Sequence, residues 1–364
     1  MRIPVVDPDH KPLMPSKPAI VRKWLKSGKA VKRWSDCGQF YVQLVEEPSG
    51  YETQDVVIGI DPGKLYSGIG VQSSKETLYT THLNLPFKVV RMRMEQRKMC
   101  RKGRRGRRIN RKVAFHPRAH RQERYSNRRK SKLPPSIRAN RQLELRIVKE
   151  LCLIYPVSYI VYEYLKVDTD LKSGRKKARS GKGFSPVMAG QKWMIKQLEA
   201  FAPVKTILGY TTSIIRDKLN LSKNKVNKST PEFNTHAVDG VAIACSHFIE
   251  YRKFHKDGVS GGDWFGNVGA TKASFFIIGR PPYSRRQLHH MVPAKGGIRC
   301  KYGGSTTPFG LRKGDLVNTP KGVGFVSGYT KNLVSVSGFK WIRLGQITES
   351  KVHLIRRSNG LIVF

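Results

Sequence analysis

The chain has 364 residues, of which 69 are Lys or Arg and 25 are Asp or Glu, and its formal net charge is +44. A globular protein with this excess repels itself unless a polyanion neutralises it, so nucleic acid is the expected partner and an anionic membrane surface is the alternative. We find no apolar run long enough to cross a bilayer, no secretory signal and no Cys-x-x-Cys pair among the five cysteines, and therefore expect a cytoplasmic protein of two or three modules, without a membrane partner, a zinc site or disulfides.

The first 54 residues have the composition of a small basic module. Residues 12–15 are Pro-Leu-Met-Pro, and the apolar residues of 17–34 are spaced roughly as one helix face, with Arg22, Lys23, Lys26, Lys29, Lys32 and Arg33 elsewhere. A strand is expected at 40–44. Such a module can contact phosphates, or its basic face can simply be solvated.

Residues 56–60 are all apolar or glycine, which is typical of a buried strand, and this strand ends at Asp61 in an Asp-Pro-Gly turn. Strand-like pieces at 68–72 and 77–85 follow with short links, which predicts an antiparallel meander. A carboxylate at the end of a core strand is poorly solvated unless it binds something, and a divalent metal is the natural candidate. The alternative is that Asp61 only starts a tight turn, where Asp and Gly are common.

Residues 91–132 contain 19 Lys or Arg and only two acidic residues. Arginine binds phosphates in a bidentate way and stays charged, so a helix of this composition is expected to contact nucleic-acid backbone rather than bases. A disordered basic tail or a localisation signal is the alternative, although the position between two core-forming segments disfavours a tail. The residues expected to contact nucleic acid here are Arg91, Arg93, Arg97, Lys98, Arg101, Lys102, Arg104, Arg105, Arg107, Arg108 and Arg111.

Helices and strands alternate in the next part of the chain. The expected elements are a helix over 136–155, a buried strand over 157–163, a helix over 188–201, a strand over 204–210, and a helix that opens at Thr235, with Asn234 or Thr235 as its cap. Two polar stretches are expected to be loops, one Lys-, Gly- and Ser-rich at 168–186 and one Asn- and Lys-rich at 219–234.

Residues 280–364 contain short β-rich pieces separated by glycine, with 15 Lys or Arg and two acidic residues. This pattern predicts a small β-barrel domain. Arginine commonly reads guanine edges, so the basic residues of this domain are candidates for contact with DNA. These candidates are Arg285, Arg286, Arg312, Lys313, Arg343 and Arg356. The alternative is a generic barrel with a basic surface.

Three carboxylates stand at matched places: Asp61 and Glu163 end core strands, and Asp239 lies in the first turns of a core helix, three residues after His236. If they converge, they repel by several kcal/mol unless cations neutralise them. Two Mg²⁺ ions about 4 Å apart can activate a water and stabilise the leaving oxygen of a phosphodiester. His236 can position that water, exchange a proton or bind metal. Alternatively, Glu163 is satisfied at a sheet edge, Asp239 complements a helix N-terminus, and His236 is a core histidine.

Several stretches resemble motifs of a known family. Residues 58–63 resemble the first RuvC motif, 161–163 the second and 236–240 the third, and the Arg-rich window between the first two resembles the bridge helix of RNA-guided nucleases. Residues 12–15 match the PLMP signature of the transposon-encoded IscB and IsrB proteins, relatives of the CRISPR type II effectors. No His-Asn-His-type cluster stands between Glu163 and His236, so the chain resembles IsrB, the form without an HNH domain.

The resemblance implies an α/β fold: an RNase H-like (RuvC) core split by an Arg-rich bridge helix, with an N-terminal PLMP module and a C-terminal β-rich, barrel-like domain. The implied domains are 1–54 (PLMP module), 55–87 (RuvC part I), 88–133 (bridge helix and basic linker), 134–186 (RuvC part II), 187–279 (RuvC part III) and 280–364 (the domain that reads a motif adjacent to the target). Asp61, Glu163 and Asp239 would then be metal ligands for two Mg²⁺ ions, and His236 a further catalytic residue.

The corresponding function is RNA-guided nicking of DNA by a monomeric protein inside a ribonucleoprotein. A long guide (omega) RNA pairs with one strand of a target duplex that carries a short flanking motif, and the region 91–132 holds the heteroduplex. The displaced strand is cut at the single magnesium site. Two alternatives stay open: a guide-independent RuvC-type nuclease acting on structured or transposon DNA, and a non-catalytic RNA-binding protein whose carboxylates are structural.

Overall fold

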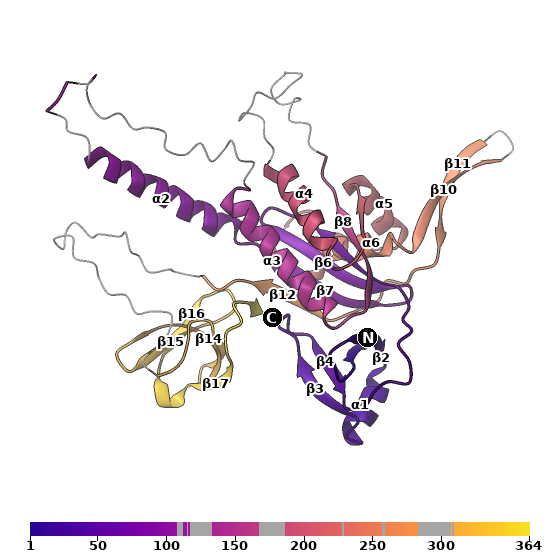
Figure 1. The fold of residues 1–364 in the computed structure, drawn as a ribbon, viewed down its shortest axis with the longest axis horizontal. Coiled ribbons are helices and arrows are strands. Elements are labelled where there is room, and N and C mark those ends of the chain that lie inside the picture. Colours follow the sequence, from indigo (N-terminus) through magenta and orange to yellow (C-terminus); the bar gives the residue numbers. More distant parts are fainter. Residues whose placement is uncertain are drawn as a thin grey trace. The chain divides into compact units, whose positions relative to one another are not determined.

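The computed structural model describes residues 1–107, 112–114, 116, 133–166, 186–227, 229–256, 259–282, 307 and 309–364, which form a mixed α/β protein (Figure 1). The chain divides into two units, Met1–Phe276 and Ile277–Phe364. In the described ranges, no helix has both the length and the apolarity needed to cross a membrane.

The N-terminal module is a four-stranded sheet with one helix. Its elements are β1 (Ile3–Val6), β2 (Pro12–Ser16), α1 (Pro18–Lys26), β3 (Ala30–Trp34) and β4 (Phe40–Leu44), and the strand order is β2-β1-β4-β3. The predicted strand at 40–44 is confirmed. The helix predicted over 17–34 is wrong beyond Lys26, because Gly28 takes a φ of +74° after the helix and the chain returns as β3. Ala30 at the start of β3 joins the core of the module, and the rest of β3 is exposed.

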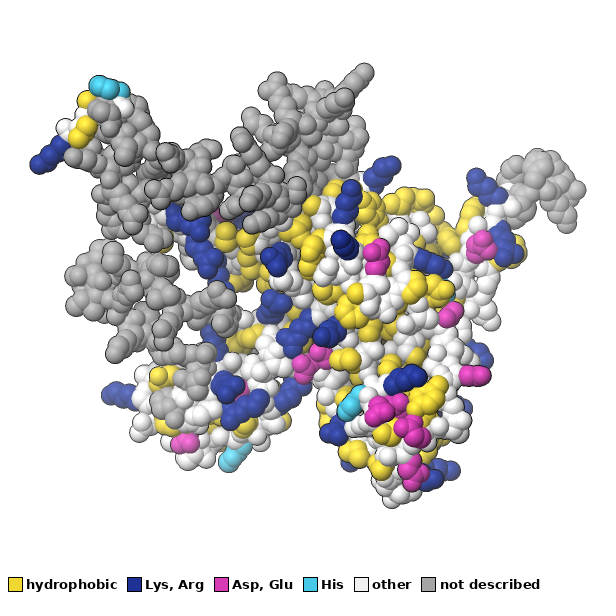
Figure 2. Space-filling model, viewed as in Figure 1, with side chains coloured by type: hydrophobic (Ala, Val, Ile, Leu, Met, Phe, Trp, Pro, Cys, Tyr) yellow, Lys and Arg dark blue, Asp and Glu magenta, His cyan; other side chains and the backbone are white. Residues whose placement is uncertain are grey.

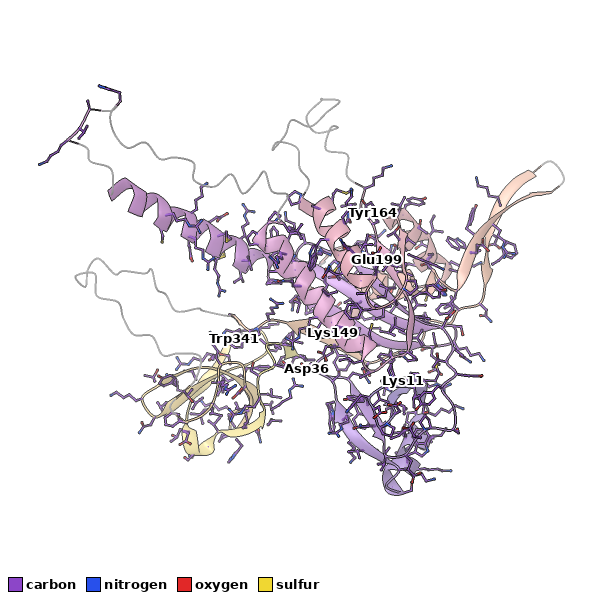
Figure 3. All side chains as sticks on the ribbon, in the orientation of Figure 1. Lys11, Asp36, Lys149, Tyr164, Glu199 and Trp341 are labelled. Atoms are coloured by element: carbon purple, nitrogen blue, oxygen red, sulfur yellow. The ribbon has the colours of Figure 1, made fainter. Side chains whose placement is uncertain are left out.

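The turn between β3 and β4 attaches this module to the rest of the first unit. Arg146 of α3 (Pro135–Cys152) donates a hydrogen bond of 3.0 Å from Nη2 to Oδ2 of Asp36 (Figure 3, where Asp36 is labelled). The hydroxyl of the buried Tyr79 lies 3.5 Å from the carbonyl oxygen of Cys37 in the same turn. A buried tyrosine and an ion pair therefore fix the turn.

The central sheet of the first unit has the strand order β7-β6-β5-β8-β9. The strands are β5 (Val56–Asp61), β6 (Tyr66–Ser73), β7 (Thr77–Asn84), β8 (Val157–Glu163) and β9 (Val204–Ile207). The first three form an antiparallel meander, as predicted, and β8 and β9 run parallel to β5. Ile60 lies opposite Tyr162, so the carboxyl ends of β5 and β8, with Asp61 and Glu163, meet at one edge of the sheet.

The helices of this unit are α2 (Phe87–Arg107), α3, α4 (Pro186–Leu198), α5 (Gly209–Lys218), a π-helical turn η2 (Phe233–Ala237) and α6 (Val238–Cys245). The helices predicted at 136–155 and 188–201 are confirmed within three residues at each end. The strand predicted to reach residue 210 is wrong after Ile207, because Gly209 begins the unexpected α5. The predicted loop at 168–186 lies outside the described residues, except Pro186.

The start of the segment that carries His236 and Asp239 also differs from the prediction. Neither Asn234 nor Thr235 caps a helix: the Thr235 hydroxyl donates to the carbonyl oxygen of Glu232 at 2.7 Å, and the segment begins as a π-helical turn without a side-chain cap. Such turns are rare in proteins overall, and those that do occur are often found at functional sites. All eight residues of α6 are buried, including Asp239.

Helix α6 packs into a groove of the sheet that is lined by glycines. Gly59 of β5 and Gly70 of β6 lie directly opposite each other, and Gly240 of α6 faces them. A Cβ atom on Gly59 would lie 2.1 Å from the Gly240 carbonyl oxygen, and a Cβ atom on Gly240 would lie 2.7 Å from the Gly70 nitrogen. Helix and sheet therefore approach backbone to backbone, which is possible only where Cβ atoms are missing.

The remaining elements of the first unit are a two-stranded ribbon, β10 (Ile249–Lys256) and β11 (Val259–Gly266), and the start of β12 (Phe275–Gly279). In the second unit β18 (Ile362–Val363) pairs with β12. The other strands form one antiparallel sheet: β13 (Leu316–Thr319), β14 (Gly322–Thr330), β15 (Leu333–Ser337), β16 (Arg343–Thr348) and β17 (His353–Arg356). A short 3₁₀ turn, η4 (Glu349–Lys351), precedes β17. The predicted β-rich character is confirmed, but β16 and β17 remain the outer strands, so the described residues form an open sheet rather than the predicted barrel.

Candidate metal centre

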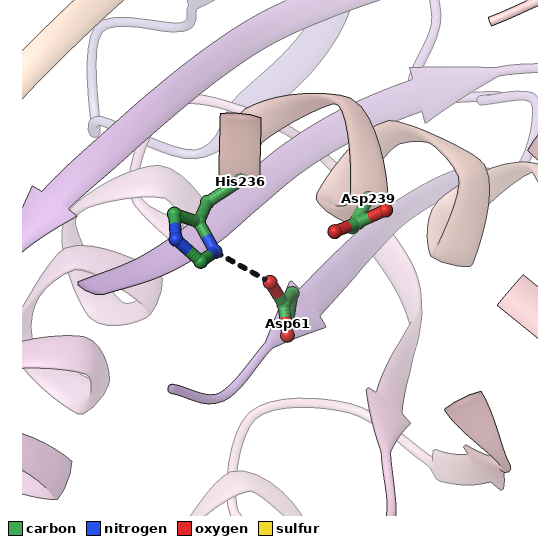
Figure 4. Close-up of side chains that lie close together, drawn as sticks. All are labelled: Asp61, His236 and Asp239. Atoms are coloured by element: carbon green, nitrogen blue, oxygen red, sulfur yellow. Dashed lines mark hydrogen bonds and ion pairs between the residues drawn. The ribbon is translucent and has the colours of Figure 1, made fainter. Parts of the chain in front are cut away.

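Three side chains from distant parts of the chain converge at the edge of the central sheet. Asp61 ends β5, His236 belongs to η2 and Asp239 belongs to α6, and one ligand atom from each lies within 4.8 Å of the others (Figure 4). Nδ1 of His236 lies 3.1 Å from Oδ2 of Asp61. Among the described residues, this is the one group of three or more His, Cys, Asp or Glu side chains with such geometry.

A further glycine brings His236 to the site. A Cβ atom on Gly68 of β6 would lie 1.8 Å from the carbonyl oxygen of His236. Because Gly68 is the register partner of Asp61, the backbone of η2 can lie against the strand next to that carboxylate. In the same way, Gly59 and Gly70 let α6, which carries Asp239, lie close against the sheet.

Helix α3 holds the turn that follows Asp61. Arg141 donates from Nη2 to the carbonyl oxygen of Gly63 at 2.6 Å and from Nη1 to the hydroxyl of Tyr162 at 3.0 Å. One guanidinium therefore connects the turn after Asp61 with the residue before Glu163. Its burial is offset by Glu144, whose Oε2 lies 2.6 Å from Arg141 Nη1; burial raises the pKa of Glu144 to about 7.

Glu163 lies beside the three-residue group but is not a member of it. Its Oε2 accepts a hydrogen bond of 2.6 Å from Thr212 Oγ1 of α5. The pKa of Glu163 is raised to about 7, first because burial disfavours the charged carboxylate and next because Asp61 is negative, with a smaller contribution from Asp239. Glu163 thus shares the electrostatic field of the group from an adjacent position.

Asp239 is contacted by two cationic side chains. Arg216 Nη1 of α5 donates to Oδ1 at 2.5 Å, and Nζ of Lys223 donates to Oδ2. The pKa of Asp239 is nevertheless raised, first by burial and then by the negative charge of Asp61. A divalent cation would relieve both effects, because it stabilises the charged form of every carboxylate around it.

The donor set suits a hard divalent cation. Carboxylate oxygens are the ligands that Mg²⁺ prefers, and Asp61 and Asp239 offer them within 4.8 Å of the His236 ring nitrogen. Nδ1 of His236 faces Asp61 at 3.1 Å, whereas Nε2 is buried and has no hydrogen-bond partner in the described part of the chain. We conclude that Asp61, Asp239 and His236 fit a metal ion, with Glu163 next to it.

A second histidine supports the first. His82 of β7 is buried, its ring centroid lies 5.4 Å from that of His236, and its Nδ1 lies 3.2 Å from Thr235 Oγ1 in η2. Burial, and then the neighbouring His236, lowers the pKa of His82 to about 4, so this ring is neutral at pH 7. The sequence contains no signal for this contact, since a lone histidine in a strand has no recognisable spacing.

The structure describes only part of the predicted nucleic-acid interface. On α2, Arg91, Arg97, Lys98 and Arg101 are exposed and Arg93 is half-buried, and Figure 2 shows Lys and Arg side chains in dark blue along this helix. Arg91 forms an exposed ion pair with Glu95 at 3.0 Å. In the second unit Arg312 is exposed, and Lys313 Nζ lies 5.7 Å from the ring centre of Trp341. Outside the described residues lie the side chains of Lys102, Arg104, Arg105 and Arg107, and all of Arg108, Arg111, Arg285 and Arg286.

Metal affinity is expected to rise with pH up to about 7. If Glu163 is a ligand of the ion, it binds in its charged form, and its pKa of about 7 means that a proton must leave first. One displaced proton gives up to about a tenfold gain in affinity per pH unit below 7. Titration with Mn²⁺ at several pH values measures this slope; Glu163→Gln should flatten it, and a flat profile in the parent chain would contradict the assignment.

Without metal, the raised pKa of Glu163 makes the folding stability fall, rather than rise, with increasing pH. Because the folded chain holds the Glu163 proton more tightly than the unfolded chain, with its ordinary pKa of 4.5, this contribution is fully present below 4.5. It is lost as the pH rises through about 7. Urea unfolding in the presence of a chelator should therefore show that Glu163→Gln gains stability relative to the parent above this pH.

Comparisons with known proteins find one matching family model, which covers just under half of the chain, and several distant solved structures. A family model described as "RRXRR protein" matches residues 3–183, and the pattern Arg-Arg-x-Arg-Arg occurs in the chain at residues 104–108. No curated protein sequence matches the chain significantly.

Similar solved structures include RuvC, a Holliday junction resolvase and a CRISPR-Cas12f complex. RuvC of T. thermophilus in complex with a Holliday junction substrate is 14% identical with a TM-score of 0.28, over 53% of this chain and 92% of that one. The yeast mitochondrial Holliday junction resolvase Ydc2 is 13% identical with a TM-score of 0.28, over 54% and 78%. A CRISPR-Cas12f ternary complex is 15% identical with a TM-score of 0.29, over 62% and 47%. These likenesses are distant, whereas over residues 3–183 the chain is similar in sequence to the RRXRR proteins.

Proposed function

We propose that the protein is an RNA-guided DNA endonuclease that nicks the displaced, non-target strand at one magnesium-dependent, RuvC-type site. The observation that carries this proposal is the convergence of Asp61, His236 and Asp239, although 175 positions separate Asp61 from His236. A sheet whose antiparallel meander is extended by two parallel strands, with acidic residues at the strand ends, also agrees with an RNase H-like core.

In this proposal, each residue of the site has a separate role in holding Mg²⁺ or in orienting its ligands. Asp61, Asp239 and His236 would hold one Mg²⁺, and Glu163 with Asp61 a second. When bound, Mg²⁺ lowers the pKa of a water and stabilises the charge on the leaving oxygen of a phosphodiester. Nδ1 of His236 faces Asp61, so this is the nitrogen that would share an ion with that carboxylate. The buried His82 and the half-buried Tyr66 lie against the ring and restrict its orientation.

Guidance by RNA is supported by charge and by its distribution. The net charge of +44 is larger than the few phosphate contacts at a single DNA cleavage site would need to balance. It suits a long polyanion, such as an RNA, that stays bound to the protein. The exposed basic side chains of α2 follow directly after the meander that ends in β7, in the place where the resembling family has its bridge helix. Because the described residues contain one carboxylate-histidine group of this kind, we propose that one strand is cut.

Purification of the protein with transcripts of its own locus tests the proposal. We expect a long RNA to copurify, and the complex to convert a supercoiled plasmid that matches the guide into the nicked form in Mg²⁺, but not in a chelator. Loss of nicking after ribonuclease treatment supports guidance. Undiminished cutting without RNA would instead establish a guide-independent nuclease, bound RNA without any cutting would establish an RNA-binding protein, and linear product would refute single-strand cutting.

A further inference from the structure

We propose that α5 is the positioning helix of the metal centre: Thr212 orients Glu163, and Arg216 orients Asp239, so that both carboxylates face the ion. This inference rests on the proposed function, and it assigns roles to two residues that lie outside the RuvC-like motifs. Residues that hold the ligands of a metal, rather than the metal itself, fix the direction of the ligand lone pairs.

The spacing of the two residues places them on one face of the helix. Thr212 and Arg216 are four positions apart, which is about one helical turn, and their exposed fractions are 2% and 6%. Between them Ile215 is fully buried and belongs to the same apolar cluster as Val241 and Ala242 of α6. The helix is therefore fixed against α6, the helix that carries Asp239.

The contact of Thr212 with Glu163 is close and specific. The hydroxyl donates to Oε2 at 2.6 Å, and this bond favours the charged carboxylate against the burial that raises its pKa. The first residue of α5 leaves room for this arrangement: a Cβ atom on Gly209 would lie 3.3 Å from Oε1 of Glu163. Since Ile207 of β9 lies opposite Glu163 in the sheet, α5 starts directly beside the carboxylate it holds.

Arg216 and Lys223 both contact Asp239, but their settings differ. Arg216 is buried and also donates from Nη2 to Ser213 Oγ at 3.0 Å, so its guanidinium is held in place at both ends. Lys223 comes from the segment after α5, and its side chain is 20% exposed. We infer that Arg216 keeps Oδ1 occupied and turns Oδ2 toward the ion, whereas Lys223 is a cation that a divalent ion replaces.

The pair Arg216→Met and Lys223→Met gives a sharp test, because each change removes one positive charge from Asp239. If only charge mattered, both variants would bind divalent metal more tightly than the parent. Positioning by Arg216 predicts instead that Arg216→Met binds Mn²⁺ about 10- to 100-fold more weakly, while Lys223→Met binds at least as tightly as the parent. The measurement is a Mn²⁺ titration of the full-length protein with its bound RNA, followed by electron paramagnetic resonance.

Thr212 is tested by an isosteric change and its rescue. Thr212→Val removes only the hydroxyl and should weaken Mn²⁺ binding about tenfold or more, whereas Thr212→Ser should restore it. Lys218→Met, which breaks only the exposed ion pair of α5 with Asp263 at 3.4 Å, serves as the control and should leave binding and melting temperature unchanged. Equal weakening by Thr212→Val and Thr212→Ser would show a packing effect and overturn the assignment.

The outcomes separate this proposal from the proposed function. Tighter binding by both Met variants, or binding by Thr212→Val that equals the parent, refutes the role of α5 even if the parent nicks DNA. A parent that binds Mn²⁺ but cuts no DNA refutes the function, and the variants still decide the role of α5. A parent that binds no Mn²⁺ overturns both. Melting temperatures within a few degrees of the parent exclude unfolding as the cause of weakened binding.

Discussion

Asp61→Asn is expected to lower the rate of DNA nicking in Mg²⁺ by about 1000-fold or more, without loss of RNA binding. After burial, the negative charge of Asp61 is the largest cause that raises the pKa of both other carboxylates, Glu163 and Asp239. An amide in its place removes a ligand from the centre of the cluster. A bound metal contributes several kcal/mol of transition-state stabilisation, and each 1.36 kcal/mol is about a tenfold change in rate.

The measurement is a single-turnover assay on a plasmid that matches the guide. Asp9→Asn is a matched control, since it makes the same chemical change at an exposed carboxylate of the N-terminal module and should leave the rate unchanged. Gel-shift analysis of the guide RNA shows whether both variants still assemble. A rate for Asp61→Asn within threefold of the parent, in assembled complexes, would mean that the convergence of carboxylates is structural.

The second large effect is expected from a methyl group in the floor of the groove that receives α6. Gly59→Ala would place Cβ 2.1 Å from the Gly240 carbonyl oxygen and 2.3 Å from the Ala244 nitrogen, and both are backbone atoms that cannot rotate away. Overpacking of a core costs about 1–3 kcal/mol. Because the same displacement of α6 moves Asp239 away from Asp61, we expect Mn²⁺ binding and nicking to be lost together with this stability.

Gly103→Ala provides the contrast. Gly103 lies in α2, and a Cβ atom there would have no neighbour within 4 Å. In a helix, alanine is favoured over glycine by about 1 kcal/mol, so this variant should be as stable as the parent or slightly more stable. Urea unfolding curves of the two variants measure the difference. Equal stability of Gly59→Ala and the parent would show that α6 can shift without cost, and would remove the physical basis for the site geometry.

Much of the site can be predicted from local patterns of the sequence. An apolar run that ends in an acidic residue predicts a core strand with a carboxylate at its end, and this held for both Asp61 in β5 and Glu163 in β8. The spacing of three between His236 and Asp239 placed both on one side of a helical segment. The structure brings His236 and Asp239 together with Asp61, whereas the catalytic roles of these residues remain predictions.

The residues that hold the site have no such signature. Helix α5 was missed because its sequence, Gly-Tyr-Thr-Thr-Ser-Ile-Ile-Arg-Asp-Lys, is rich in β-branched residues, which favour strands when tertiary contacts are unknown. Arg141 and Arg216 could not be told apart from the other basic residues, since burial and partners are properties of the folded chain. The predicted cap of η2 failed for a similar reason: Thr235 contacts His82 in the core.

The basic composition, the meander, the two further core strands and the acidic residues at the strand ends can all be predicted from the sequence, because each follows from periodicity and composition over a few residues. How closely the ligands approach one another, and which residues orient them, became known from the folded chain. Gly240 lies far in the sequence from Gly59 and Gly70, and the three glycines come together only where helix and sheet meet backbone to backbone. Long-range packing sets distances of a few ångströms, and local patterns contain no information about them.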